Sequence, residues 1–582
     1  MNVSFFNGKI VIDGYLYEEV PYDVSANNLS VCFDGKGGLT KYLSVCNGKN
    51  HLIRSFLSLY KDGERIGAYT LKHVEVCGRI QEIRLTGDGY RVDITQFISK
   101  NDDAVFIKFD FYSKKQSEFT LEYSVFSEKP PTFSSEKPYE EIPENSSVEY
   151  KVKVLGKESF PFVISFEQSQ NYCDGLVLAF EEKLGISKKE ISDVKIPVSA
   201  KTEQEKAQYL SSLFCCIENY KECQNIKGFV AGCNYLNPVR TYYRDSYWTA
   251  LSVYEYDASL VKRQIITLAK GIASDGTCPS AVKKDLSGFW SGHYDSPSFF
   301  VMMVYDYVNH TGDKGVLSVQ INGKTLIDLC EAVVLKQIEK TDETGLLKKQ
   351  GPYNKLDWAD EVNRNGYVTY DEALFYRALY CLERLCKTCR RDVSAYGVMA
   401  GRVKDKINEI LWDEEKGYYV NYKDGDFTED NLSVDTVLVY LFGISDEIRS
   451  KRMLDAMEKH LETKNNKRQL AGDYGIMCVY PFYKKPTATS YKSSQDYEYH
   501  NGANWPYLSA LYAYAKYLAG RDYKYALESW FSYNLNDGIF TPIEYFSPCR
   551  KSGSTLQAWS GLSAFVYDNI GKKSFFDSKF IK

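Results

Sequence analysis

The spacing of apolar residues changes near the first third of this 582-residue chain, and the change limits what each part can fold into. Up to about residue 198, apolar and polar residues alternate in short runs such as KIVIDGYLYEEV, the pattern of half-buried strands. From about residue 199 the apolar residues recur every three or four positions, and TEQEKAQYLSSLFCCIENY reads as a helix opened by a Thr cap. The sequence predicts an N-terminal antiparallel β-sandwich over 1–198 and a helical domain over 199–582.

The helical part contains two kinds of connection between its predicted helices. Short ones, such as TGDKG and FGISD, alternate with long ones rich in Asp, Gly, Trp and Tyr. Helices that pair up and down around a ring would place the long connections together on one face. About twelve helices then form six hairpins, so the pattern predicts an (α/α)6 toroid. The long connections are 225–245, 274–297, 341–370, 411–436, 462–504 and 533–558.

Charge and hydropathy exclude several classes of partner. The net charge is -5, and the 72 basic and 77 acidic residues form no basic block, so we expect no nucleic-acid binding. No apolar run approaches the roughly 20 residues of a membrane helix, and the N-terminus lacks the features of a secretory signal. We therefore expect a cytoplasmic protein that is not in a membrane. The cysteines and histidines show no zinc-type spacing, so neither a metal nor a cofactor is expected.

Aromatic residues make up 15% of the chain, with 48 Tyr, 31 Phe and 7 Trp. A tyrosine-rich core would account for this. A carbohydrate cleft would account for it equally well, because the C–H faces of sugar rings stack on aromatic rings. Composition alone does not separate the two, and it gives no oligomeric state.

Two of the long connections carry carboxylates beside tryptophans. The third holds Asp357 and Asp360 on either side of Trp358, and the sixth holds Glu544 ahead of LQAWS. Hydrolysis of a glycoside needs one carboxylic acid for the leaving oxygen and one carboxylate, on the opposite side of the sugar, for water. Either acid alone could be a solvated loop residue. Connections three and six of a toroid face each other, so we predict a pair, separated by roughly 6.5–9.5 Å in an inverting enzyme.

Other long connections supply candidate binding residues. Asp245 could simply cap a helix, but with Arg244 beside it the pair could hold sugar hydroxyls by charge-assisted hydrogen bonds. His293 and His500 could be packed loop residues or ligand contacts. The predicted substrate-binding residues are Arg244, Asp245, Trp248, Trp290, His293, Tyr294, Asp295, Trp358, Glu361, His500, Asn501, Trp505, Gln557 and Trp559.

Four motifs together resemble the six-hairpin glycosidases, most closely the amylo-α-1,6-glucosidase domain of glycogen debranching enzymes. They are RDSYWTAL (244–251), DWADEV (357–362), YHNGANWPYL (499–508), and PIEYFSP followed by LQAWS (542–560). The resemblance begins at about residue 203. It implies that Asp360 is the general acid, that Glu544 is the general base and that Asp245 holds the non-reducing sugar. Asp357 remains an alternative acid, because related enzymes place their acid in the same connection.

The resulting hypothesis is an inverting, exo-acting glycosidase for an α-linked, gluco-configured oligosaccharide or glycoside. Glycogen itself is a doubtful substrate, because the chain has no second catalytic barrel for glucan transfer. One alternative is a disaccharide phosphorylase of the same fold, in which Arg550 and Lys551 would contact phosphate in place of water. Another is a noncatalytic carbohydrate-binding relative, which would bind sugar without turning it over.

Overall fold

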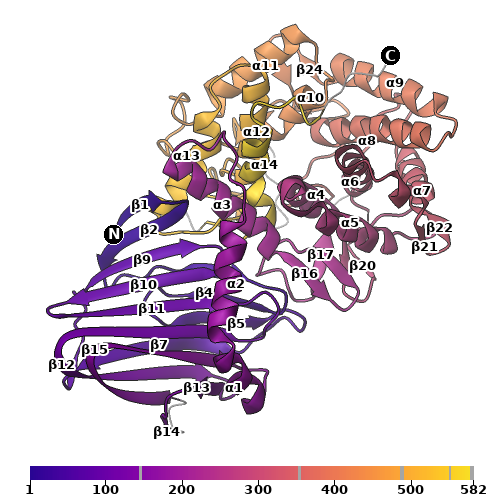
Figure 1. The fold of residues 1–582 in the computed structure, drawn as a ribbon. Helices are drawn as coiled ribbons and strands as arrows, with labels where there is room; N and C mark the ends of the chain where they lie inside the picture. Colours follow the sequence, from indigo (N-terminus) through magenta and orange to yellow (C-terminus); the bar gives the residue numbers. More distant parts are fainter. Residues whose placement is uncertain (143–146, 291, 351–355, 485–490, 550–551, 577–582) are drawn as a thin grey trace. The chain divides into compact units, whose positions relative to one another are not determined.

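The structure is a computed structural model that describes residues 1–582 except 143–146, 291, 351–355, 485–490, 550–551 and 577–582. The chain divides into two compact units, drawn in Figure 1. The first comprises Met1–Cys223, Gly232–Val239 and Asn534–Pro542, and the second comprises Gln224–Ala231, Arg240–Tyr533 and Ile543–Lys582. The N-terminal antiparallel β-sheet region and the C-terminal helical part that the sequence predicts are both present.

The first unit is built on two antiparallel sheets. Among the described residues the larger has eleven strands and the smaller has four. The larger sheet runs β1 (Asn2–Phe6), β2 (Lys9–Tyr15), β9 (Leu71–Cys77), β10 (Ile80–Gly87), β11 (Tyr90–Ile98), β12 (Val105–Ser127), β15 (Ser147–Ser165) and β13 (Thr132–Ser135), with β14 (Glu140–Ile142) on β15, β7 (Leu52–Lys61) on β12, and β8 (Glu64–Arg65) on β7. The smaller sheet contains β3 (Tyr22–Ser25), β4 (Leu29–Phe33), β5 (Leu39–Ser44) and β6 (Lys49–Asn50).

The alternating sequence places one face of the larger sheet in the core. Val92 and Ile94 of β11 pair with Phe111 and Phe109 of β12, and all four side chains are fully buried. Asp93, which lies between them in sequence, points away and remains partly exposed. A period of two therefore buries alternate residues along this stretch of the two strands.

Three helices complete the first unit. Figure 1 shows α1 (Gln170–Leu178) and α2 (Phe180–Ser192) along the larger sheet, where Phe180 packs on Phe97 and Phe106. Helix α3 (Glu203–Glu218) begins at a capping box, in which Thr202 and Glu205 each bond the other's backbone N–H. Helix α3 belongs to the first unit, whereas the sequence pattern placed it at the start of the helical domain. Strand β16 (Tyr220–Cys223) follows.

The second unit consists of helices joined by long connections with short strands. The helices are α4 (Tyr243–Leu251), α5 (Tyr254–Lys270), α6 (Ser296–Thr311), η2 (Lys314–Ser318), α7 (Leu326–Ile338), α8 (Thr369–Thr388), α9 (Ser394–Ile410), η3 (Val434–Val437), α10 (Leu438–Leu441), α11 (Glu447–His460), η4 (Tyr491–Ser493), α12 (Pro506–Leu518), α13 (Lys524–Asn536), η5 (Ala558–Leu562) and α14 (Ser563–Asn569). The strands are β17 (Ile226–Phe229), β18 (Arg240–Tyr242), β19 (Ala281–Lys283), β20 (Gly288–Phe289), β21 (Gln320–Ile321), β22 (Lys324–Thr325), β23 (Tyr367–Val368), β24 (Trp412–Asp413), β25 (Tyr418–Tyr419), β26 (Tyr422–Asp424), β27 (Phe427–Glu429), β28 (Leu432–Ser433) and β29 (Val479–Tyr480).

Six of these elements contact one another in a closed order. Helix α4 packs on α6, α6 on α8, α8 on η3, η3 on α12, α12 on η5, and η5 on α4. Helices α5, α7 and α9 pack against members of this group. Helix α8 is buried along most of its length, as expected for a helix with neighbours on every side. No helix in the described part of the chain has both the length and the apolar character of a membrane span.

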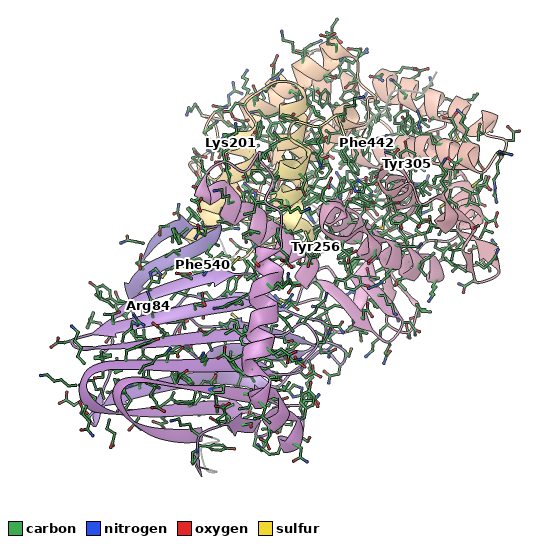
Figure 2. The ribbon with its side chains drawn as sticks, in the orientation of Figure 1. Arg84, Lys201, Tyr256, Tyr305, Phe442 and Phe540 are labelled. Carbon is green, nitrogen blue, oxygen red and sulfur yellow. The ribbon has the colours of Figure 1, made fainter. Side chains whose placement is uncertain are left out.

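A buried ion pair lies among these helices. The guanidinium of Arg377 lies 5.6 Å from the ring centroids of Tyr305 and of Phe442, two residues labelled in Figure 2. Its Nη2 lies 3.7 Å from Oδ1 of Asp306, whose Oδ2 accepts a hydrogen bond of 2.8 Å from the hydroxyl of Tyr247. Burial raises the pKa of Asp306 to about 6, against the opposing effects of Arg377 and Tyr247.

Candidate active site

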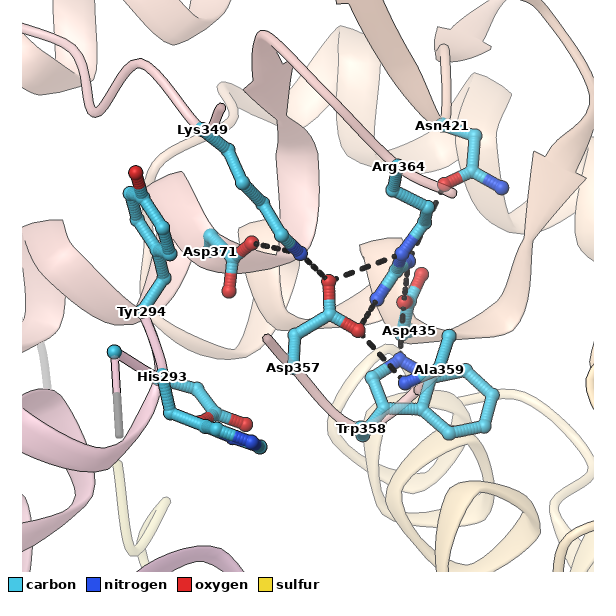
Figure 3. Close-up of polar contacts among 12 residues, drawn as sticks. His293, Tyr294, Lys349, Asp357, Trp358, Ala359, Arg364, Asp371, Asn421 and Asp435 are labelled. Carbon is cyan, nitrogen blue, oxygen red and sulfur yellow. Dashed lines mark hydrogen bonds and ion pairs between the residues drawn. The ribbon is translucent and has the colours of Figure 1, made fainter. Parts of the chain in front are cut away.

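Asp357 is fixed within a buried network of charges, shown in Figure 3. Arg364 donates from Nη2 to Oδ1 at 2.7 Å and from Nε to Oδ2 at 3.2 Å, and Lys349 also pairs with Oδ2. The backbone N–H of Ala359 donates to Oδ1 at 2.7 Å. Burial alone would raise the pKa of Asp357, but Arg364 and Lys349 hold it well below its usual range. Asp357 is therefore a permanently ionised anchor of the loop, which argues against it as the proton donor.

The network extends to residues that the sequence analysis missed. Nη1 of Arg364 donates to Oδ2 of Asp435 at 2.7 Å, and Nε1 of Trp358 donates to the same oxygen at 2.6 Å. Lys349 also pairs with Asp371 at 3.2 Å. The sequence offers one signal for such buried network residues, namely a charged residue within an apolar run, as Asp435 is in LSVDTVLVYL. Such buried carboxylates need cationic partners to be stable.

Asp360 projects from the same loop and keeps 19% of its side chain exposed. Its Oδ1 lies 3.9 Å from Nε2 of His500. Nδ1 of His500 accepts a hydrogen bond of 3.3 Å from the backbone N–H of Glu361, and burial holds the pKa of His500 well below its ordinary value. The ring is therefore neutral, and because Nδ1 accepts, the proton is assigned to Nε2, which faces Asp360.

Glu544 has little exposed surface, and its backbone pairs with a segment ten residues later. Its backbone N–H donates to the carbonyl of Ser554 at 2.9 Å, and Gly553 donates to the carbonyl of Tyr545 at 2.8 Å. A Cβ at residue 553 would stand 2.7 Å from Cβ of Glu544 and 2.8 Å from the backbone nitrogen of Tyr545. The segment paired with Glu544 thus needs glycine at this position.

Two adjacent residues connect the two predicted catalytic carboxylates. The hydroxyl of Tyr499 donates to Oε1 of Glu544 at 3.4 Å, and the next residue, His500, faces Asp360. The ring centroids of Tyr499 and His500 are 4.0 Å apart. Tyr499 has a φ of +40°, a left-handed conformation that costs about 1 kcal/mol or more for a non-glycine residue. The structure therefore brings together residues from the third, fifth and sixth predicted connections.

Arg244 and Asp245, at the start of α4, belong to a second cluster. Nη1 of Arg244 lies 3.2 Å from Oδ2 of Asp295, and Nε lies 3.5 Å from Oδ2 of Asp245. Nδ1 of His293 is 3.4 Å from Oδ1 of Asp295, and the Arg244 guanidinium is 5.4 Å from the ring centroid of Trp559. Each of these five residues was predicted to bind substrate, and the fold gathers them from three connections.

The charges of this cluster act on one another. Burial would raise the pKa of Asp295, but Arg244 and His293 lower it below its ordinary value. Burial raises the pKa of Asp245, and Arg244 offsets this only in part. Burial would lower the pKa of Arg244, but Asp295, Asp245 and, to a smaller extent, Asp360 raise it well above its ordinary value. The charge of the predicted acid thus reaches the predicted binding cluster.

A comparison with protein families identifies the class of this site. The family model for amylo-alpha-1,6-glucosidase matches residues 218–564, which is more than half of the chain and includes all the clusters above. The chain belongs to the amylo-alpha-1,6-glucosidase family. The prediction of a glycosidase made from the four motifs is thereby confirmed.

Three solved glycosidase structures are similar to this chain at low sequence identity, and the first of them shares its fold. A bacterial glucoamylase complexed with acarbose is similar with a TM-score of 0.64 and 14% identity over 99% of this chain and 97% of that one. A rhamnosidase from Klebsiella oxytoca with rhamnose bound has a TM-score of 0.48 and 15% identity over 81% and 86% of the two chains. A GH63 mannosylglycerate hydrolase from Thermus thermophilus in complex with glucose has a TM-score of 0.46 and 15% identity over 61% of this chain and 98% of that one. No curated protein matched the sequence.

Several predicted residues of this amylo-alpha-1,6-glucosidase family member support the site from within the protein. Trp248 is fully buried against Tyr247, Phe299 and Tyr507, and its Nε1 has no hydrogen-bond partner among the described residues, so its part in substrate binding stays a prediction. Trp505 is buried too, and His500 stacks on it with ring centroids 5.0 Å apart and planes 16° apart. It positions the histidine.

The remaining predicted residues make contacts with other parts of the protein. Trp559 stacks on Tyr507 at 4.3 Å, and with its amide turned, Gln557 accepts from Nε1 of Trp559 at 3.2 Å. Oδ1 of Asn501 accepts a hydrogen bond of 3.1 Å from the backbone N–H of Tyr483. The hydroxyl of Tyr294 donates to the backbone carbonyl of Lys348 at 3.2 Å. Both side chains thus link two segments of the connections. Trp290 is largely exposed and lies nearly parallel to the His293 ring.

Two further expectations concern metal ions and phosphate. The described residues contain no group of three or more His, Cys, Asp or Glu placed to hold a metal ion. Arg550 and Lys551, on which the phosphorylase alternative depends, lie outside the described residues.

Proposed function

We propose that this protein is an inverting, exo-acting glycosidase that removes a terminal α-linked glucose, with Asp360 as general acid and Glu544 as general base. The observation that carries the proposal is the contact of two consecutive residues, Tyr499 and His500, with Glu544 and Asp360. It places both carboxylates around one short segment. The name of the family and the acarbose bound in the similar glucoamylase support glucose as the sugar.

We also propose that the helical part is the (α/α)6 toroid. The closed order of contacts through α4, α6, α8, η3, α12 and η5 supports it. In such a ring, the connections that precede the inner helices gather at one end. The predicted catalytic and binding residues come from those connections.

The proposed reaction is a single displacement at the anomeric carbon. Asp360 transfers its proton to the glycosidic oxygen as the bond between that oxygen and C1 breaks. A water molecule forms the new bond to C1 from the opposite face, and Glu544 takes the proton that the water loses. The released glucose has the inverted configuration, and exchange of protons with solvent restores both carboxyl groups.

The surroundings of Asp360 suit a proton donor. Asp357, three residues earlier, is held by Arg364, so the turn that carries Asp360 has a fixed position. His500 is neutral and therefore adds no positive charge that would favour loss of the proton from Asp360. Its Nε2–H faces the carboxyl group at 3.9 Å, close enough for a small movement on substrate binding to form a hydrogen bond.

The Arg244 cluster is suited to bind the terminal sugar. Nε2 of His293 is buried and has no hydrogen-bond partner among the described residues, and Nε of Arg244 and Oδ2 of Asp245 form no hydrogen bond and lie 3.5 Å from each other as an ion pair. Buried polar atoms normally have partners, so their concentration in one place points to a ligand that supplies them. The hydroxyls of a sugar both donate and accept, and Trp559 offers an aromatic ring beside them.

The test is product release from a panel of α- and β-linked gluco-, manno- and rhamno-oligosaccharides, with and without phosphate, for the wild type and Glu544→Gln. We expect phosphate-independent release of glucose from α-linked gluco-oligosaccharides, lost in the variant. Turnover that requires phosphate would favour the phosphorylase. Sugar binding without any turnover would favour the noncatalytic relative.

A further inference from the structure

Three tyrosines form an exposed aromatic surface on the first unit. The side chains of Tyr15, Tyr17 and Tyr69 are 42%, 52% and 78% exposed. The rings of Tyr15 and Tyr17 are nearly parallel, at 9°, with centroids 6.0 Å apart, and Tyr69 lies edge-on at 6.1 Å and 5.5 Å from them. We call these three residues the tyrosine platform. Exposed apolar side chains that cluster in this way mark binding surfaces more often than isolated ones do.

The backbone beneath the platform is rigid. Tyr15 is the last residue of β2 and pairs with Leu71 of β9. Beyond the strand, the backbone of Tyr17 donates to the carbonyl of Ala68 at 3.0 Å, next to Tyr69. The rings therefore project from fixed positions, so a ligand would need to order little of the protein on binding.

A cavity of about 390 Å³ adjoins the platform and shares Tyr17 with it. Its lining includes the ring of Phe56 and the polar side chains of Arg65 and Ser58, which are 3.4 Å apart. Aromatic faces and hydroxyl or guanidinium donors thus lie side by side. This combination matches a sugar, which presents C–H faces for stacking and hydroxyls for hydrogen bonds.

The charges around the cavity argue for a neutral ligand. Glu19 pairs with Arg54 at 2.5 Å and lies 3.6 Å from Lys36, and Asp34 and Arg65 also line the cavity, so two carboxylates offset most of the positive charge of three cations. A polyanion would have to displace these pairs. A neutral carbohydrate leaves them intact.

We propose that the tyrosine platform and this cavity bind a chain of α-linked glucose residues, at a site separate from the catalytic loops of the second unit. The identity of the sugar rests on the proposed function, whereas the existence of the site rests on the platform itself. Such a site holds a polymeric substrate at the enzyme without taking part in bond cleavage. It raises the affinity for polymers and leaves the hydrolysis of short oligosaccharides unchanged.

The experiment is native electrophoresis of the full-length protein in gels containing soluble glycogen or amylopectin, with Glu544→Gln as the background to prevent digestion. The double variant Tyr17→Ala/Tyr69→Ala removes two platform rings, and Tyr17→Phe/Tyr69→Phe keeps them. Phe6→Ala is the matched control, because Phe6 is 61% exposed on β1 and does not belong to the platform. We expect the polysaccharide to slow the migration of the Glu544→Gln parent, of the phenylalanine double variant and of the Phe6→Ala control. The alanine double variant should bind the polysaccharide about tenfold more weakly than the parent.

The alanine pair in the wild-type background should retain its kcat/KM on a short α-linked oligosaccharide. If the alanine pair migrates like its parent, or if no polysaccharide slows the parent, the platform site is wrong whatever the catalytic result. If the parent is slowed through the platform but the wild type hydrolyses no glucoside, the site stands and the proposed function fails.

Discussion

Nε2 of His500 lies 3.9 Å from Oδ1 of Asp360, while Nδ1 of the same ring accepts a backbone hydrogen bond from Glu361. The histidine is tied to the loop that carries Asp360, and its remaining proton faces this proposed acid. Trp505 supports the ring from behind by stacking. The neutral histidine is thus a positioning residue for Asp360.

His500→Leu should lower kcat/KM by about tenfold, a smaller loss than removal of a general acid, because it removes the donor that restrains Asp360. An N–H donor favours the ionised carboxylate, so its loss should move the descending limb of the pH profile to higher pH. His500→Gln keeps a donor and should restore part of both effects. The pH dependence of kcat/KM is the measurement, and identical limbs in all three proteins would disprove this role.

Asp357→Asn should destabilise the protein, because it leaves Lys349 and Arg364 buried with less negative charge; a loss of about 3 kcal/mol is typical for such a pair. The depressed pKa of Asp357 contributes stability above the ordinary aspartate range. The difference from wild type should therefore narrow as the pH falls below about 4. Asp360→Asn should unfold like the wild type and lose activity. Urea unfolding measures the stability of both variants, and a hydrolysis assay measures their activity. An Asp357→Asn protein of native stability but without activity would favour Asp357 as the acid.

Gly553→Ala should reduce kcat by about tenfold or more with the fold retained, because its Cβ would collide with the backbone beside Glu544 and move the carboxylate. Gly401→Ala is the control, since Gly401 lies in α9 with open space around it. Steady-state kinetics measures kcat of the two variants, and circular dichroism checks that each retains the fold. Equal activity in the two variants would show that Gly553 does not set the position of Glu544.

Asp306→Asn should gain stability relative to wild type as the pH rises from 4 to 7. The folded-state pKa of Asp306 is about 6, above the ordinary value of 3.8, so the folded protein binds more protons in this window and loses stability as the pH rises. The asparagine does not titrate. The difference in unfolding free energy should change by roughly 2–3 kcal/mol between these pH values. A difference that stays constant would contradict a raised pKa.

The main features of the fold follow from local sequence pattern. A period of two buries Val92 and Ile94 in β11, and the Thr202 cap marks where α3 begins. The motifs with Asp360 and Glu544 identify the family without structural information. These signals are local, so the sequence alone reveals them.

What the sequence did not reveal depends on distant partners. Arg364 and Asp435 are 71 residues apart, and nothing near either one indicates their ion pair. Asp357 and Asp360 look alike in sequence, and only the pairing of Asp357 with Arg364 in the structure distinguishes the buried, ion-paired residue from the proposed acid. Trp248 could face a cleft or the core, and its packing against Phe299 could not be read from its sequence neighbours.

The most direct test compares Asp360→Asn and Glu544→Gln on α-glucosyl fluoride and on an α-linked gluco-oligosaccharide. Fluoride departs without a proton, so loss of the general acid should slow the oligosaccharide by about 100-fold or more and the fluoride far less, whereas loss of the base should slow both. Equal losses on both substrates for Asp360→Asn, or an active Glu544→Gln, would contradict the assignment of acid and base.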